Sequence, residues 1–257
     1  MKISVISPIK HSGTTMVSLF LGQALAVTQG VNVMLTYSGM SRRICEYASV
    51  SALEDKTCSI SQVVKLMEAR AISPEDLFDY SLGVCTNLHI MDTADPTLTE
   101  EDGTKLMTYV FDNIPSDVTI CDVSGEIFDE TTQQIFSTSD IVVIVIQPDT
   151  HSYEMLRKWK ESEFWPKKKD VMVVVNRYDE EIAALREISK RIGVAHVNVC
   201  KLHYSPYITK YANSRDSLTI VPFAVQKDPR VIELNNDLKE MCQYVISSME
   251  GRFKWEV

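Results

Sequence analysis

The sequence lacks a long apolar run. The longest, Ile141 to Ile146, is far shorter than the ~20 residues that a helix needs to cross a bilayer. The sequence also lacks the charged region and the cleavage pattern of a signal peptide after Met1, because a strand pattern begins within two residues. We therefore expect no signal peptide and no membrane span, and we expect a cytoplasmic protein.

Cysteine pairs at C-x-x-C spacing are also absent. The 6 cysteines are scattered, with no histidine pair nearby, which argues against a zinc site and against a disulfide framework. An excess of basic residues is missing too, since the net charge is −9. Such a chain has no overall attraction to nucleic acid or anionic lipid. We interpret the one basic run, Lys167 to Lys169, as a solvated loop.

Linkers rich in glycine, serine or proline, repeats and low-complexity tracts are missing as well. A chain of 257 residues with 45% hydrophobic content can bury one large core. The sequence therefore predicts a single domain over residues 1–257. Within it, segment 41–82 lacks strand periodicity and is expected to be a helical excursion, and 231–250 is expected to be a C-terminal helix with one apolar side.

Short β-rich runs alternate with helical segments along the rest of the chain, which is typical of βαβ units. Several runs are apolar on consecutive residues, as expected of strands covered on both faces. The prediction is a three-layer α/β/α fold with a mostly parallel sheet of about seven strands. The expected strands are Lys2–Ser7, Val31–Tyr37, Asn87–Met91, Val118–Asp122, Ile141–Ile146, Val171–Val175 and Val194–Cys200. The expected helices between them are Thr14–Gln29, Glu100–Asn113, Glu130–Ser137, Ser152–Glu161 and Glu180–Ile192.

A degenerate phosphate-binding loop follows the first expected strand. In the G-x-x-x-x-G-K-[ST] pattern, backbone amides hold the phosphates, the lysine reaches the β- and γ-phosphates, and the hydroxyl holds Mg²⁺. Here Pro8 takes the place of the first glycine and Gly13 keeps the second. Thr14 replaces the lysine and Thr15 keeps the hydroxyl. The loop is in the expected place, but its lysine is gone.

Four later segments complete a pattern that spans roughly residues 1–213. The first, Gly30–Ser38, is a second strand, and the next, Pro115–Gly125, is an apolar strand that ends in an aspartate. Asp140–Asp149 consists of an aspartate, an apolar strand and a proline, and Val173–Asp179 contains an N-[RK]-x-D motif. Their order and spacing resemble the ParA/MinD family of P-loop ATPases, which carry a deviant Walker A loop. The resemblance implies the P-loop NTPase fold of that family.

The resemblance also implies a site for ATP or ADP with Mg²⁺. Asp122 matches the Walker B aspartate and, with Thr15, would hold Mg²⁺. Asn176 matches the asparagine that reads the adenine edge, Arg177 follows it, and Pro206 lies in a turn that the family places beside the base. The loop contributes the other cofactor-binding candidates, which are Lys10, His11, Ser12, Gly13, Thr14, Thr15 and Met16.

Structural roles stay open for the same residues. Asp122 could cap a turn, Asn176 could be a turn residue, and Thr15 could be a helix N-cap. The histidines show no serine, cysteine or carboxylate partner at motif spacing, so surface or core roles are favoured for all of them. They are His11, His89, His151, His196 and His203.

Several charged groups of the family pattern are missing. Ile9 stands at the position of the family's signature lysine, and Lys10 is displaced by one residue. On the second strand, Thr36 and Ser38 replace a pair of aspartates. Losing one electrostatic contact to a transferring phosphoryl group typically lowers the rate by ~10²–10³. Hydrolysis is therefore expected to be very slow or absent, and nucleotide binding to be weak or absent.

Two functions are compatible with these features. The leading hypothesis is a localisation or assembly scaffold, with a protein partner from a positioning machine that could recruit it to the membrane or cell pole, and with a homodimer as an option. The alternative is a slow ATPase that dimerises with ATP and uses Lys10 in a remodelled loop. A membrane-binding module is disfavoured because the tail Arg252–Val257 is too short for a stable helix on its own.

Overall fold

Eight strands form one sheet in the order β3-β4-β2-β5-β1-β6-β7-β8. The computed structural model describes residues 1–39, 43–48, 63, 65–67, 69–91, 99–123, 126–167 and 169–253. The strands are β1 Lys2–Ile6, β2 Val33–Tyr37, β3 Leu82–Cys85, β4 Leu88–Met91, β5 Val118–Asp122, β6 Ile141–Ile146, β7 Asp170–Tyr178 and β8 Val199–His203. All neighbouring strands are parallel except β3 and β4, which pair antiparallel.

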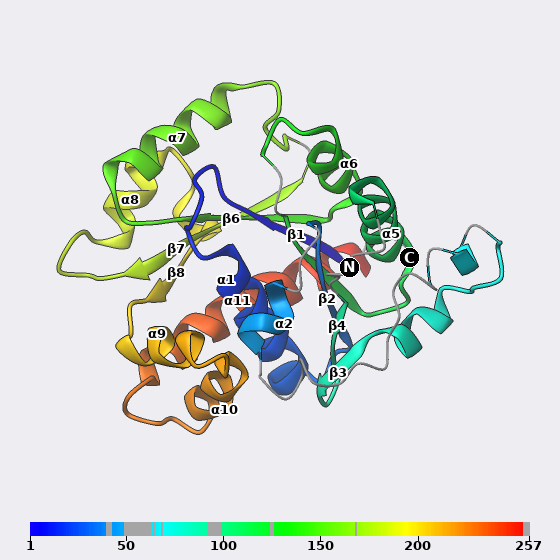
Figure 1. Ribbon diagram of the computed structural model, residues 1–257. Coiled ribbons are helices and arrows are strands. Elements are labelled where there is room, and N and C mark those ends of the chain that lie inside the picture. Colours follow the sequence, from blue (N-terminus) through cyan, green and yellow to red (C-terminus); the bar gives the residue numbers. More distant parts are fainter. Residues whose placement is uncertain are drawn as a thin grey trace.

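Helices cover both faces of this sheet (Figure 1). One face carries α1 Thr14–Ala24, α2 Arg43–Ala48, α10 Ile220–Val225 and α11 Ile232–Phe253. The other face carries α5 Glu100–Asn113, α6 Glu130–Thr138, α7 Thr150–Glu161 and α8 Leu185–Ile192. Helix α9, Pro206–Asn213, follows β8. The predicted three-layer α/β/α fold is confirmed, with one strand more than expected.

The alternation of side chains along each strand builds a core on both faces. In β1, Ile3 and Val5 pack with α1 and α11 on one side, whereas Ile6 packs with α6 and α7 on the other. All six residues of β6 are buried, as expected for a central parallel strand. The central strands are thereby fixed from both sides, and the loops at their carboxyl ends are held on a rigid base.

Some boundaries differ from the predicted ones for local reasons. The expected strand at Val194–Cys200 begins only at Val199, because His196–Asn198 form a 3₁₀ turn, and it continues to His203. The expected helix Thr14–Gln29 changes to a π-helix at Leu25–Gln29. Much of the expected excursion 41–82 lies outside the described residues; the described parts include α2 and a 3₁₀ helix at Glu75–Tyr80. The tail beyond residue 253 lies outside them too.

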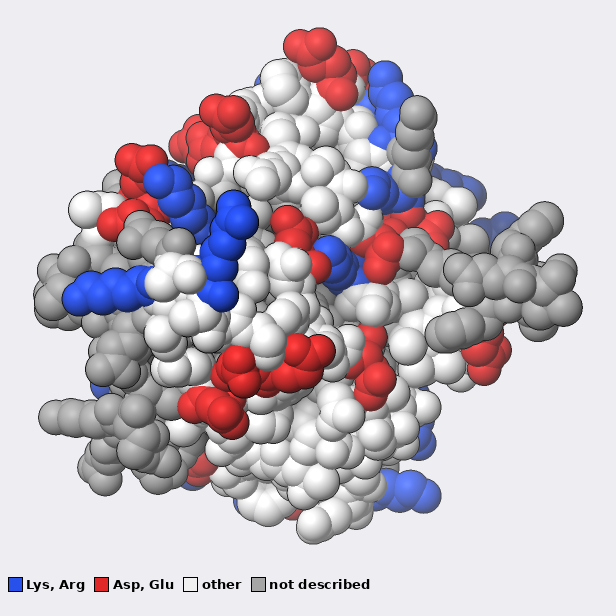
Figure 2. Space-filling model, turned by 90° about the vertical axis from the view of Figure 1, so that its right-hand side faces the viewer, with Lys and Arg blue, Asp and Glu red and all other residues white. Residues whose placement is uncertain are grey.

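The surface shows no single field of charge on the side that Figure 2 presents. Acidic and basic side chains are interspersed there among the described residues (Figure 2). No helix in the described part of the chain has the length and apolar character that crossing a bilayer requires.

Candidate functional site

A cavity of about 670 Å³ opens at the carboxyl ends of the central strands. Its walls come from the loop between β1 and α1, from the ends of β5, β7 and β8, and from α9. Strand β1 lies between β5 and β6. The next strand in the sequence, β2, lies on the β5 side of β1, and β6 lies on its other side, so the strand order reverses at β1. Open α/β sheets bind ligands at such a point, outside the carboxyl ends of the strands. A cavity of this volume is in the range of small-molecule and cofactor sites.

Hydrogen bonds of two serine hydroxyl groups stabilise the loop between β1 and α1. The Ser7 hydroxyl donates to Ser12 Oγ at 2.8 Å, and the Ser12 hydroxyl donates to the carbonyl of Ile9 at 2.8 Å. The amide of Ile9 donates back to Ser7 Oγ at 3.1 Å. Two serines thus hold a turn in a segment whose family pattern is rich in glycine. Sequence patterns do not reveal this pair, because Ser12 stands at a position where the pattern allows any residue and Ser7 precedes the pattern.

The loop uses left-handed backbone at two residues. Gly13 has φ +94° and His11 has φ +64°. His11 therefore adopts the conformation that a glycine would favour, at a cost of roughly 1–2 kcal/mol for a residue with a Cβ. Its carbonyl accepts a hydrogen bond from Gln147 Nε2 at 3.1 Å, which helps to hold this backbone. The loop keeps a compact turn although histidine stands where the family has glycine.

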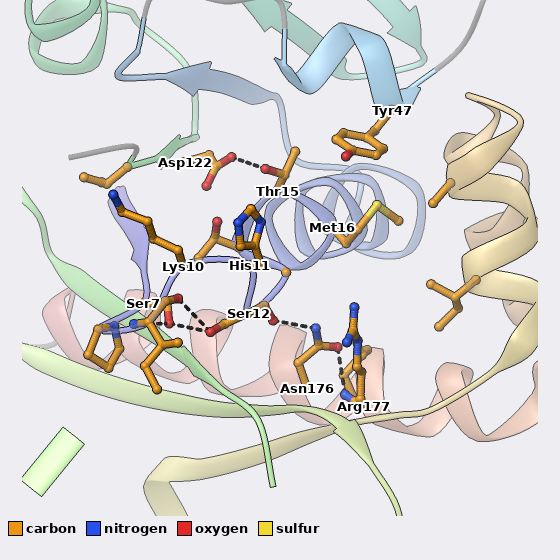
Figure 3. Close-up of a pocket in the computed structure, with 18 of the residues that line it drawn as sticks. Ser7, Lys10, His11, Ser12, Thr15, Met16, Tyr47, Asp122, Asn176 and Arg177 are labelled. Carbon is orange, nitrogen blue, oxygen red and sulfur yellow. Dashed lines mark hydrogen bonds between the residues drawn. The ribbon is translucent and has the colours of Figure 1, made fainter. Parts of the chain in front are cut away.

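Asn176 fastens the loop to β7. Its Nδ2 donates to the carbonyl of Ser12 at 2.7 Å, and its Oδ1 accepts from the amide of Arg177 at 2.9 Å (Figure 3). A Cβ at Gly13 would lie 2.3 Å from Asn176 Nδ2, so only glycine leaves room for this contact. Asn176 lines the cavity, and each end of its amide has a partner.

Thr15 and Asp122 meet at the first turn of α1. The Thr15 hydroxyl donates to Asp122 Oδ2 at 2.6 Å, and both residues are buried (Figure 3). A hydroxyl and a carboxylate are oxygen ligands of the kind that Mg²⁺ prefers. This pair therefore fits the magnesium side of a nucleotide site. No cluster of three or more histidine, cysteine, aspartate or glutamate side chains suited to a metal occurs in the described part of the chain.

Such a site has few basic side chains that could contact a phosphate. Thr14 stands at the start of α1, where the family pattern has its lysine. Lys10 lines the cavity mouth, and its Nζ lies 3.8 Å from Glu126 Oε1. Both side chains of this ion pair are largely exposed, at 82% and 69%, so the pair is weak. At the end of β2, buried Thr36 donates to the carbonyl of Ile120 instead of presenting a carboxylate.

His203 and Asp237 form a pair that the sequence patterns did not reveal. His203 ends β8 and lines the cavity, and its Nδ1 lies 2.8 Å from Asp237 Oδ2 on α11. The backbone amide of His203 donates to the same oxygen at 2.8 Å. Burial raises the pKa of the Asp237 carboxyl, and the contacts from His203 oppose that rise. The sequence shows no carboxylate partner for His203 at motif spacing, because 34 residues separate it from its aspartate.

The structure brings nearly all of the predicted site residues to one cavity. The lining includes the whole loop from Lys10 to Met16, together with Asp122, Asn176 and Arg177. Pro206 begins α9 and does not belong to the described lining, whereas its neighbours Ser205 and Ile208 do. Tyr47 of α2 and Phe128 also line the cavity, and no motif pointed to either.

No protein-family model and no curated protein matches this sequence. Solved structures do match its fold. MinD in the MinC:MinD cell division complex of Aquifex aeolicus aligns with a TM-score of 0.70 and 16% identity, covering 96% of both chains. A ParA family ATPase from Chlorobium tepidum TLS aligns with a TM-score of 0.69 and 16% identity, covering 94% of this chain and 97% of that one.

A third match is a nucleotide complex. The septum site-determining protein MinD from Pyrococcus horikoshii, complexed with Mg-ADP, aligns with a TM-score of 0.66 and 15% identity over 95% of both chains. Identities this low speak to the fold and not to the activity. The chain therefore has the fold of the MinD and ParA P-loop ATPases, as the order and spacing of its motifs predicted.

Proposed function

We propose that this protein is a MinD/ParA-like localisation or assembly scaffold, which binds nucleotide weakly or not at all and acts through a protein partner. One observation carries the proposal. The loop at the start of α1 has the position of a nucleotide cradle, but Thr14 stands where the family pattern has its lysine, and the exposed side chain of Lys10 lies beside Glu126.

The remaining groups support binding better than chemistry. The start of α1 offers backbone amides at the positive end of a helix, which favours an anion. Thr15 and Asp122 would hold Mg²⁺ beside it. Phosphoryl transfer, however, depends on positioning and on cations that neutralise charge as it develops. A site with a metal side but without its lysines is poorly equipped for that step.

The matched proteins suggest the class of partner. One solved relative is MinD in a complex with MinC, and another is a plasmid partition protein from Borrelia burgdorferi bound to AMPPNP. A chain with this fold and without turnover would serve a positioning or assembly machine as a binding component. Weak ATP or ADP binding with Mg²⁺ is part of the proposal, as is a homodimer.

We expect purified protein to release phosphate from ATP no faster than a protein-free blank. Thr14→Lys alone should not restore turnover, because Thr36 and Ser38 still stand where the family has carboxylates. A coupled phosphate-release assay with ATP and Mg²⁺ measures the turnover of the wild-type protein and of Thr14→Lys. Asp122→Ala is the matched control, since it removes the carboxylate of β5 from the metal side of the same site. Sustained phosphate release that disappears in Asp122→Ala would refute the scaffold and favour the slow ATPase.

A further inference from the structure

The imidazole of His203 is fixed from two sides. Its Nδ1 contacts both oxygens of Asp237, at 2.8 and 3.0 Å, and Asp237 is fully buried. The ring of Tyr178 packs against it edge to face, with centroids 5.1 Å apart. Such contacts determine the orientation of the ring and the placement of its proton. A neutral ring that donates from Nδ1 presents Nε2 as an acceptor.

Nε2 is the one polar atom of this side chain that the contacts above leave available. No described residue forms a hydrogen bond with it, and the side chain is 16% exposed at a residue that lines the cavity. Asp237 contacts only the opposite edge of the ring. A buried carboxylate that holds an imidazole from behind is the arrangement that aims its second nitrogen at a ligand.

The position of His203 suits the base of a nucleotide. Strand β8 is the third strand from β1 in the sheet, which places their ends roughly 14 Å apart at a spacing of ~4.8 Å per strand. The loop after β1 offers amides for phosphate, so a nucleotide that begins there would carry its base toward the ends of β7 and β8. Ser205 and Ile208 of the α9 segment line the same end of the cavity.

Asn176 is held in place by its bonds to the loop and to its own strand. Its amide nitrogen is bonded to Ser12, and its amide oxygen is bonded to the amide of Arg177. These two bonds fix the orientation of the amide, so a base could use only its remaining N–H and its remaining lone pair. His203 can accept a hydrogen bond without breaking any contact that the structure shows.

We propose that His203 is a specificity-determining residue that reads the base edge through Nε2 and favours purines with a 6-amino group over those with a 6-oxo group. Asp237 is the positioning residue behind it. The 6-amino group of adenine donates to an acceptor, whereas the 6-oxo group of guanine would face it with a second acceptor. This inference rests on the weak nucleotide binding included in the proposed function.

The test is an NMR titration at pH 8 with ATP, GTP and tripolyphosphate, each with Mg²⁺. The wild-type protein should bind ATP roughly tenfold more tightly than GTP, the effect of one hydrogen bond gained and one repulsion avoided. His203→Asn keeps an N–H toward Asp237 but has no group at the Nε2 position. It should bind ATP as weakly as GTP and leave tripolyphosphate affinity unchanged. His196→Asn, at an exposed histidine, is the matched control and should change nothing.

A second readout covers the case in which His203→Asn does not fold. In the wild-type protein, the Nε2 resonance of His203 should shift with ATP and stay in place with tripolyphosphate. Equal affinities for ATP and GTP, an equal loss of both in His203→Asn, or an unmoved Nε2 resonance would overturn the proposal. A protein that binds none of the three ligands would overturn it too, while a lack of turnover would still agree with the scaffold function. Phosphate release from ATP would refute the scaffold without affecting the base preference.

Discussion

Gly13→Ala is expected to lower the free energy of unfolding by about 3 kcal/mol. The backbone of Gly13 has φ +94°, where a Cβ costs about 1–2 kcal/mol. The added Cβ would also lie 2.3 Å from Asn176 Nδ2, and forcing a packed group aside typically costs a further 1–3 kcal/mol. Because that nitrogen holds the carbonyl of Ser12, the change should also disorganise the loop and weaken ATP binding.

Gly30→Ala is the matched control for this prediction. Gly30 has φ +68° as well, but no atom of the described residues lies within 4 Å of the position of its Cβ. Denaturant titration should therefore show a loss of only about 1 kcal/mol for this variant. In the double variant with Asn176→Ala, part of the Gly13→Ala loss should be relieved, giving a coupling of about 1 kcal/mol or more. Equal losses at the two glycines, with no coupling, would mean that Asn176 does not fasten the loop.

Asp237→Ala is expected to lose about 3 kcal/mol of stability, since leaving one buried donor without its acceptor costs about 1–3 kcal/mol and Asp237 serves two donors. Asp237 is fully buried and accepts from both the amide and the imidazole of His203, so its removal leaves two donors of β8 without their acceptor. It also detaches β8 from α11 at this point. Denaturant titration at pH 7 measures the change.

Two further variants distinguish the contribution of Asp237 from that of His203. Asp237→Asn keeps the shape and one acceptor oxygen, and should lose less than Asp237→Ala. His203→Asn keeps a donor toward the carboxylate and should lose about 1 kcal/mol or less. If Asp237→Ala were as stable as the wild-type protein, the pair would not join β8 to α11, and the support for a fixed His203 ring would be removed.

The fold could be predicted from the sequence because its central strands carry their own signal. Ile141–Ile146 is apolar on consecutive residues, and Val118–Asp122 begins with three β-branched residues; the observed strands have the predicted bounds. Strand β3 was missed because Leu82–Cys85 is only partly buried and contains a glycine, so it shows neither an apolar run nor alternation. Helix α9 was missed because its signals, Ser205 as N-cap and Pro206 at the first turn, also describe an ordinary turn.

The sequence predicted the site residues that lie within recognisable motifs. It did not predict the contacts that folding creates between distant segments. Thr15 and Asp122 come from the loop and strand that the motifs indicate, and they meet at 2.6 Å. Contacts between distant segments leave no pattern in a single sequence, as His203 with Asp237 shows. The Ser7–Ser12 bond was missed for another reason, because hydroxyl pairs of this kind have no characteristic spacing.

We propose that the loop between β1 and α1 does not couple nucleotide binding to assembly. A ligand shifts an equilibrium only by its differential affinity for the two states, and the signature lysine that would contact a partner's nucleotide is replaced by Ile9. Light scattering with and without ATP and Mg²⁺ tests this directly, with Lys10→Ala as the companion variant. We predict the same molar mass in both conditions and in both proteins. A monomer that becomes a dimer only with ATP, and stays a monomer in Lys10→Ala, would contradict the claim and identify Lys10 as a working signature lysine.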